Sequence, residues 1–288
     1  MKKLIVNKKY DNKKLSNFIF DSFPDLNKNI FFKALRKKDI RINNIRVNSD
    51  CLVHTNDEIT IYILDNLLVK ETVIDTIYED NNILIVNKPE NLPVTDDKNS
   101  SETLTSILRK KYDYIAPCHR IDRNTKGLVL FAKNDISLNI LLEKFKNKEI
   151  EKHYYCKILG ILDEKHKVLE AYLFKDSKKS FVYISDTPKK EYQKIITEYT
   201  VLEENKKLNI SSLDITLHTG KTHQIRAHLA HIGHPILGDG KYGDYEINKK
   251  FNLKTQELYS YSLTFNFKTP SNILEYLKNK TITLKKEK

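Results

Sequence analysis

An acidic side chain lies between two arginines in a polar stretch of the sequence: Asp122 has Arg120 and Arg123 as near neighbours. Guanidinium groups close to a carboxyl group favour its charged form. A carboxylate that keeps its charge is a poor general acid near neutral pH, but it can act as a nucleophile or as a base. The same pattern is also compatible with a surface turn that carries two ordinary ion pairs.

The segments around this turn indicate how the carboxylate is positioned. An apolar run from Leu128 to Phe131 follows Gly127, which predicts a buried strand directly after the turn. A helix is predicted over residues 136–148, and a strand that ends at Gly160 is predicted to begin near Lys152. The expected inward face of that helix consists of Ile136, Ile140, Leu141 and Phe145. Asp122 is therefore expected at the edge of a core.

A later segment combines a strand, a polar turn and a helix, and it contains two motifs that could suggest other chemistry. Gly220-Lys221-Thr222 resembles part of a phosphate-binding loop, but Ile215 stands where that motif requires glycine. Five histidines between His218 and His234 lack the spacing and the carboxylate or cysteine partners of a known metal site. A glycosidase would need a second carboxylate in a comparable setting. We therefore expect no nucleotide cofactor and no metal.

Composition restricts the class of protein. The chain has 288 residues, a net charge of +12 and a pI of about 9.3, which favours a polyanionic partner. Residues 1–70 hold 14 Lys and Arg against 8 Asp and Glu. Three widely spaced cysteines fit neither a disulfide framework nor a zinc site and suit a cytoplasmic protein. No segment approaches the ~20 apolar residues that a membrane-spanning helix needs.

The basic N-terminal region has a distinctive order of predicted elements. Two helices, near residues 14–20 and 29–37, precede a hairpin from Ile40 to Val47 and a strand over residues 59–63. This order resembles the alpha-L RNA-binding motif of a small-subunit ribosomal protein. The resemblance implies an RNA-facing surface on the second helix and the hairpin, although a merely solvated charged face remains the alternative. The residues that match that surface are Lys33, Arg36, Lys37, Lys38, Arg41 and Arg46.

Four blocks, in order, resemble the RluA-type pseudouridine synthases. The block around Asp122 spans residues 119–133 and reads HRIDRxTxGLVLFAK. It is preceded by VNKP at residues 86–89 and followed by KxY at residues 152–154. The last block combines TGKTHQIRxHL at residues 219–229 with GHPILGD at residues 233–239. The resemblance covers about residues 75–265, and Asn91 stands where the family usually has glycine.

This resemblance implies the isomerisation of uridine to pseudouridine in RNA, without a cofactor or a metal. Asp122 matches the catalytic aspartate, Tyr154 the tyrosine that packs against the flipped uracil, and Arg226 the basic partner of the aspartate. The sequence does not decide whether Asp122 attacks the nucleoside or removes a proton from its sugar. Substrate binding is expected to involve Arg120, Ile225, Lys221 and His119.

The sequence therefore predicts an α+β protein with two domains. Residues 1–68 would form the small helix-helix-hairpin RNA-binding domain, and residues 69–288 the catalytic domain, a mixed, largely antiparallel sheet flanked by helices. The expected partner is structured RNA, most of all large-subunit ribosomal RNA, and a monomer without membrane contact is expected. Two alternatives remain: a transfer-RNA pseudouridine synthase, and a non-catalytic RNA-binding or ribosome-assembly protein on the same fold.

Overall fold

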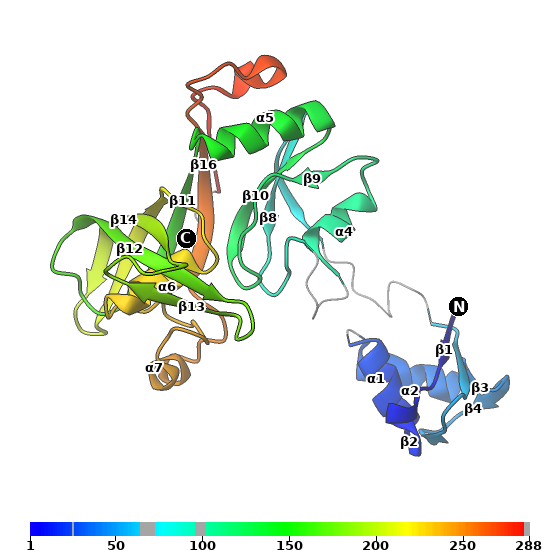
Figure 1. The fold of residues 1–288 in the computed structure, drawn as a ribbon. Helices are drawn as coiled ribbons and strands as arrows, with labels where there is room; N and C mark the ends of the chain where they lie inside the picture. Colours follow the sequence, from blue (N-terminus) through cyan, green and yellow to red (C-terminus); the bar gives the residue numbers. More distant parts are fainter. Residues whose placement is uncertain (25, 64–72, 96–101, 285–288) are drawn as a thin grey trace. The chain divides into compact units, whose positions relative to one another are not determined.

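The chain folds into two compact units in a computed structural model that describes residues 1–24, 26–63, 73–95 and 102–284. The N-terminal unit spans Met1–Val73 and the C-terminal unit spans Ile74–Lys288 (Figure 1). The boundary predicted between residues 68 and 69 lies outside the described residues. No helix in the described part of the chain is long and apolar enough to cross a membrane.

The N-terminal unit contains the predicted helix, helix, hairpin and strand. Four strands form its main sheet in the order β1-β6-β3-β4, and β2 pairs with β5. The hairpin turns at Asn43 and Asn44, which both have a positive φ, as a tight two-residue turn requires. The elements are β1 (Lys2–Ile5), η1 (Lys8–Tyr10), β2 (Lys13–Lys14), α1 (Leu15–Ser22), α2 (Lys28–Lys37), β3 (Ile40–Ile42), β4 (Ile45–Val47), β5 (Leu52–Val53) and β6 (Glu58–Ile61).

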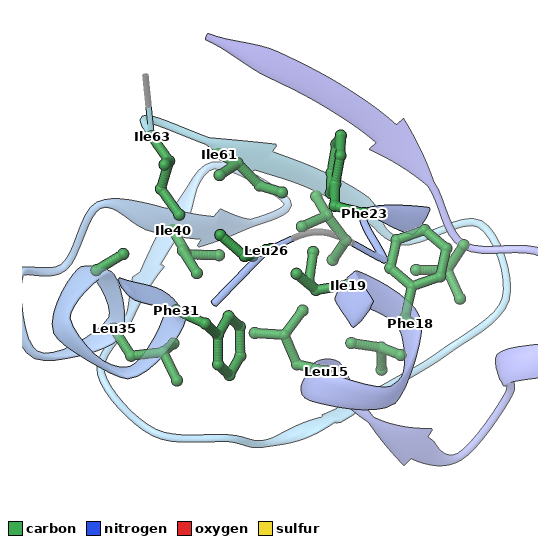
Figure 2. Close-up of a cluster of buried hydrophobic side chains, with 14 of the residues drawn as sticks. Leu15, Phe18, Ile19, Phe23, Leu26, Phe31, Leu35, Ile40, Ile61 and Ile63 are labelled. Carbon is green, nitrogen blue, oxygen red and sulfur yellow. The ribbon is translucent and has the colours of Figure 1, made fainter. Parts of the chain in front are cut away.

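This unit has its own apolar core, which Figure 2 shows between the two helices and the sheet. Leu15 and Ile19 of α1 are buried against Phe31 of α2, and Ile40 and Ile61 contribute from the strands. Burial of such side chains stabilises a fold by about 1.5–3 kcal/mol each. The basic residues of α2 therefore lie on the face that the core does not use.

The C-terminal unit is built on one large sheet, in which eleven of the described strands take part. Its main path runs β13-β12-β14-β15-β11-β16-β10-β8-β7, with β9 on β10 and β17 on β16. The strands are β7 (Asp75–Glu79), β8 (Ile83–Lys88), β9 (Ala116–Pro117), β10 (Lys126–Ala132), β11 (Ile150–Leu159), β12 (His166–Asp176), β13 (Phe181–Ser185), β14 (Gln193–Asn205), β15 (Ile210–Leu217), β16 (Leu258–Phe265) and β17 (Thr281–Thr283). The helices are α4 (Leu104–Arg109), α5 (Asp135–Lys146), α6 (Gln224–His231), α7 (Tyr245–Lys250) and the 3-10 helix η2 (Asn272–Leu277).

Strand β10 is buried on both faces, which explains its continuous apolar run. Leu128 and Leu130 belong to the core under α5, whereas Val129 and Phe131 belong to the core under α4. Within the described strands, β10 runs parallel to β16 and the remaining pairs are antiparallel. Gly127 permits this pairing, because a Cβ at its position would lie 2.0 Å from the carbonyl oxygen of Ser260. The strand therefore fixes the end of the Asp122 turn.

The predicted inward face of the helix over residues 136–148 is partly wrong. Leu141 is buried, but Ile136 at the first turn is exposed. A lysine takes a place on the inward face instead: the Lys144 side chain is buried and its Nζ lies 2.8 Å from Oε2 of Glu149. A paired charge can occupy a core position that periodicity assigns to an apolar residue.

One further difference concerns the length of the strands. The charged residues within 165–215 predict a series of short strands with charged turns, but β12 has 11 residues and β14 has 13. Several of these charged residues lie instead at exposed or half-buried positions within the two long strands. Asn91, by contrast, has φ 60, the left-handed conformation that asparagine tolerates and glycine usually supplies.

Candidate active site

A cavity of about 970 Å³ lies in the C-terminal unit where the Asp122 turn faces the loop before α6. Its wall combines residues 119–125, the β11 strand, the loop and first turn of α6, and the loop after β8. All seven site residues predicted for this unit line it: His119, Arg120, Asp122, Tyr154, Lys221, Ile225 and Arg226. The fold thus brings together residues that are about a hundred positions apart in the sequence.

Asp122 forms an ion pair with Arg226, in which Nη1 of the arginine lies 2.9 Å from Oδ2 of the carboxylate. The Arg226 side chain is nearly buried, whereas that of Asp122 is 23% exposed and faces the cavity. The neighbouring arginines contact other groups: Arg120 donates to Thr95 Oγ1 and Arg123 donates to the Asn91 carbonyl, each at 3.3 Å. The turn is therefore not a surface turn that pairs Asp122 with its sequence neighbours.

A second carboxylate, Asp239, holds the other side of the Arg226 guanidinium. Its Oδ2 and Oδ1 accept from Nε and Nη2 at 2.7 and 2.9 Å. Burial disfavours the cation, but the hydrogen bonds and charges of Asp239 and Asp122 raise the pKa of Arg226. A planar guanidinium that binds one carboxylate at two points has a fixed orientation. Arg226 is therefore aimed at Asp122 by Asp239, a partner that the sequence did not predict.

The backbone of the Asp122 turn is held by the buried side chain of Lys88. This side chain is fully buried, and its Nζ donates to the carbonyls of Pro89, Leu92 and Arg123 at 2.6, 2.8 and 2.9 Å. Burial lowers the pKa of Lys88 to about 7, whereas the nearby Asp122 charge and the three accepting carbonyls favour the ammonium form. Lys88 thus joins the loop after β8 to the turn that carries Asp122.

Tyr154 enters the cavity from β11 at an irregularity in the sheet. The pairing of β11 with β16 shifts between His153 and Tyr154, and such bulges redirect side chains near functional sites. The ring is buried in the core beside Ile225 and also lines the cavity. Burial, together with the charge of Asp122, raises the pKa of Tyr154. The hydroxyl is therefore neutral at physiological pH.

The four predicted substrate-binding residues differ in whether their side chains are available to a ligand in the cavity. Arg120 and Lys221 are exposed at the cavity, and Ile225 forms part of its apolar wall. His119 is engaged with the backbone, because its Nε2 accepts from Leu130 N at 3.1 Å. Burial, and then the charge of Lys152, lowers its pKa to about 3, so the ring is neutral. Two of the four thus present positive charge where a phosphate could lie.

The histidines between His218 and His234 bind separate partners. Each ring has a different one: Glu198 for His218, Tyr242 for His223, Thr197 for His228, Asp186 for His231 and the Leu159 carbonyl for His234. Among the residues that the structure describes, no three His, Cys, Asp or Glu side chains gather in a group that could hold a metal ion. His223 alone of these five lines the cavity.

The basic residues predicted for the N-terminal unit lie on α2 and the β3–β4 hairpin. Lys33, Arg36, Lys37, Lys38 and Arg46 are exposed. Arg41 is half-buried and its guanidinium lies 4.9 Å from the centre of the Tyr62 ring. Arg41 and Arg46 are also direct cross-strand neighbours.

A protein family matches the part of the chain that contains most of the residues lining this cavity. Residues 82–231, slightly more than half of the chain, match the RNA pseudouridylate synthase family. This range contains the Asp122 turn, Tyr154 and the helix that carries Arg226. The match therefore covers the three residues that the sequence singled out.

Relatives resemble the chain over nearly its full length. A Mycoplasma capricolum protein named as an uncharacterized RNA pseudouridine synthase is 33% identical over 98% of this chain and 97% of its own. A ribosomal large subunit pseudouridine synthase C of Buchnera aphidicola is 33% identical, with 92% and 89% covered. The corresponding protein of Vibrio cholerae is 30% identical, with 80% and 77% covered.

The fold also has solved counterparts. The human RNA pseudouridylate synthase domain containing 1 superposes with a TM-score of 0.59 at 22% identity, covering 75% of this chain and 91% of its own. The human domain containing 4 gives 0.58 at 21% identity, with 73% and 88% covered. These likenesses establish the mixed α+β fold. Together with the relatives and the matched residues, they show that the chain belongs to the RNA pseudouridylate synthase family, in its RluA group, and is an isomerase that acts on RNA.

Proposed function

We propose that this enzyme converts specific uridines of large-subunit ribosomal RNA to pseudouridine, with Asp122 as its catalytic carboxylate. The ion pair between Asp122 and Arg226 at the wall of the cavity is the observation that carries the assignment of the residue. The choice of RNA rests on two relatives that are named for the ribosomal large subunit and cover most of the chain.

The proposed chemistry needs a base that has left its stack, which costs a few kcal/mol. Stacking on the Tyr154 ring and contact with Ile225 recover part of that cost. Asp122 then attacks the target nucleoside or removes a proton from its sugar, the bond between N1 and the sugar carbon breaks, and the uracil turns. C5 bonds to the sugar carbon, C5 loses its proton, N1 takes up a proton, and Asp122 returns to the free carboxylate. Arg226 keeps the carboxylate charged and oriented before it reacts.

A decisive test uses large-subunit ribosomal RNA transcribed in vitro and the purified full-length protein. We expect the wild type to form pseudouridine, measured by chromatography of the RNA nucleosides. The variant Asp122→Asn should form none within the sensitivity of the assay while its affinity for the RNA stays near that of the wild type, because the amide keeps the shape but loses the charge. Equal conversion by the two proteins would contradict the role of Asp122.

The N-terminal unit is proposed to bind structured RNA through the exposed basic residues of α2 and the hairpin. Like charges directly opposite in a sheet are destabilising, and Arg41 faces Arg46 across the β3–β4 pair. Phosphates would relieve this repulsion. None of the six basic residues takes part in the ion pairs found within residues 1–24 and 26–63. The alternative is that the face is only solvated.

Charge reversal on α2 distinguishes these readings. The triple variant Lys33→Glu, Arg36→Glu, Lys37→Glu should weaken RNA binding. The slope of log Kd against the logarithm of the salt concentration should fall by about 2–3, because about 0.7–0.9 counterion is released per phosphate contact. Reversal of Lys146, Lys249 and Lys250, which are exposed lysines of the C-terminal unit, is the charge-matched control. An unchanged slope in the α2 variant alone would mean that this face does not contact RNA.

A further inference from the structure

His223 has an unusual backbone conformation beside the catalytic carboxylate. It immediately precedes α6 and adopts φ 53 and ψ 19, in the left-handed region. This conformation is strained for a non-glycine residue, and such residues persist where the surroundings hold them at functional sites. The conformation leaves the imidazole at the cavity, with Nε2 4.0 Å from Oδ2 of Asp122.

The position of Asp122 favours a proton on Nε2 of His223. The Tyr242 oxygen accepts from the backbone N–H of Val182 at 3.0 Å and lies 2.9 Å from Nδ1 of His223. When the Tyr242 hydroxyl donates to Nδ1, the ring proton is on Nε2, the nitrogen that faces the Asp122 carboxylate. The opposite tautomer would turn an Nε2 lone pair toward a carboxylate, which is repulsive.

One turn therefore arranges both neighbours of Asp122. Asp239 begins this turn, holds the Arg226 guanidinium at two points and accepts the backbone N–H groups of Lys241 and Tyr242 through Oδ1. Tyr242 ends it, holds His223 and places its ring 5.3 Å from the Arg226 guanidinium. Arg226 and His223 both face the same oxygen of Asp122, Oδ2.

We propose that His223 is a positioning residue of this enzyme, which donates a neutral Nε2–H to the Asp122 carboxylate when RNA closes the cavity. The 4.0 Å separation is too long for a hydrogen bond in the free protein, and catalytic hydrogen bonds commonly shorten in the substrate complex. This inference rests on the proposed role of Asp122.

The electrostatic surroundings favour a donor that stays uncharged. Burial lowers the pKa of His223 to about 4; the charges of Asp122 and Asp239 oppose this, and those of Arg226 and Lys241 add to it. Burial raises the pKa of Tyr242 to about 12, so its hydroxyl proton is present at neutral pH. His223 therefore orients Asp122 without neutralising it, whereas an imidazolium would compete with Arg226.

The test compares His223→Leu with His223→Gln under single-turnover conditions on large-subunit ribosomal RNA transcribed in vitro. Both replacements bear a similar backbone strain, but only glutamine can donate from the position of Nε2. We expect the leucine variant to convert uridine about 10–100-fold more slowly, the value of one hydrogen bond to a charged group, with unchanged RNA affinity and melting temperature. Glutamine should recover most of the rate, and Tyr242→Phe should give an intermediate loss.

Two controls separate this inference from the proposed function. His231 is the last residue of α6, and its ring binds Asp186 outside the cavity. The variant His231→Leu should therefore convert uridine at the wild-type rate. Wild-type conversion by His223→Leu, with Asp122→Asn inactive, would overturn the inference and leave the role of Asp122 intact. Equal slowing by leucine and glutamine would overturn it as well, because it would indicate a structural role. A wild type that forms no pseudouridine would instead contradict the proposed function.

Discussion

Two clusters of buried charged side chains in the C-terminal unit each pair a cation with one or more carboxylate groups. They differ in how much of the carboxylate is exposed to solvent. In one, Arg226 lies between Asp239 and Asp122, and the Asp122 side chain keeps 23% of its surface exposed. In the other, Lys144 and Glu149 are 2% and 3% exposed. Both oxygens of Glu149 accept hydrogen bonds, from Lys144, Thr269 and the backbone of residues 268 and 269.

The two clusters differ in whether a ligand could reach the carboxylate. A charge in a dry interior is tolerated when all its hydrogen bonds are satisfied, and Glu149 fulfils that condition. In Asp122, Arg226 and His223 face the same oxygen, and the side chain lines a cavity. We expect changes in the first cluster to lower the rate of uridine conversion and changes in the second to lower stability.

The largest effect is expected for Arg226→Leu. It leaves two carboxylates without their shared cation, so Asp122 loses its orientation and the rate of uridine conversion should fall at least about 100-fold, as small misplacements of reacting groups do. Arg226→Lys should be intermediate, because an ammonium cannot bind two carboxylates with the same geometry. Single-turnover rates measure both, with the exposed Arg109→Leu as control. A leucine variant as fast as the wild type would remove the distinction between the clusters.

The next effect concerns stability. Lys144→Met leaves Glu149 buried without its partner, which should lower the free energy of unfolding by about 3–5 kcal/mol. The double variant Lys144→Met, Glu149→Gln should recover part of that loss, since neither side chain then carries a charge. Urea unfolding measures the loss, and the conversion rate per folded molecule should stay at the wild-type value. A fall in that rate would show that the second cluster also serves catalysis.

A smaller effect is expected from acid. Burial opposes the charge of Glu149, but hydrogen bonds from Lys144, from residues 268 and 269 and from the Thr269 hydroxyl lower its pKa to about 2 from the ordinary 4.5. A depressed carboxyl pKa contributes stability that is present above the unfolded-state value and is lost as the pH falls through the folded-state value. The unfolding free energy of the wild type should therefore fall between about pH 4.5 and 2. Glu149→Gln should give a flatter profile over that range.

Much of the C-terminal unit could be predicted from the sequence, because the local pattern of apolar residues agrees there with their burial. The run after Gly127 became β10, and Asn91, which stands where the family usually has glycine, has a left-handed conformation that asparagine tolerates. Contacts between segments that are distant in the sequence were harder to predict. Helical periodicity placed Ile136 in the core because it considers only the spacing of apolar residues. It cannot identify Lys144, a lysine that is buried because it pairs with Glu149. Asp239 and His223 stood in recognised blocks, but their contacts depend on where the turn at Tyr242 folds back, which no local pattern encodes.

The position of β16 in the sequence determines when the pocket can form during translation. This strand, formed by Leu258–Phe265, pairs with β11 on one side and β10 on the other. The half of the sheet next to the Asp122 turn and the half that carries Tyr154 are thus joined by a strand that follows both of them in the sequence. Since a polypeptide is synthesised from its N-terminus, β16 can join the two halves of the pocket only after the ribosome has translated residue 265. The pocket is therefore assembled after the whole N-terminal unit has been translated.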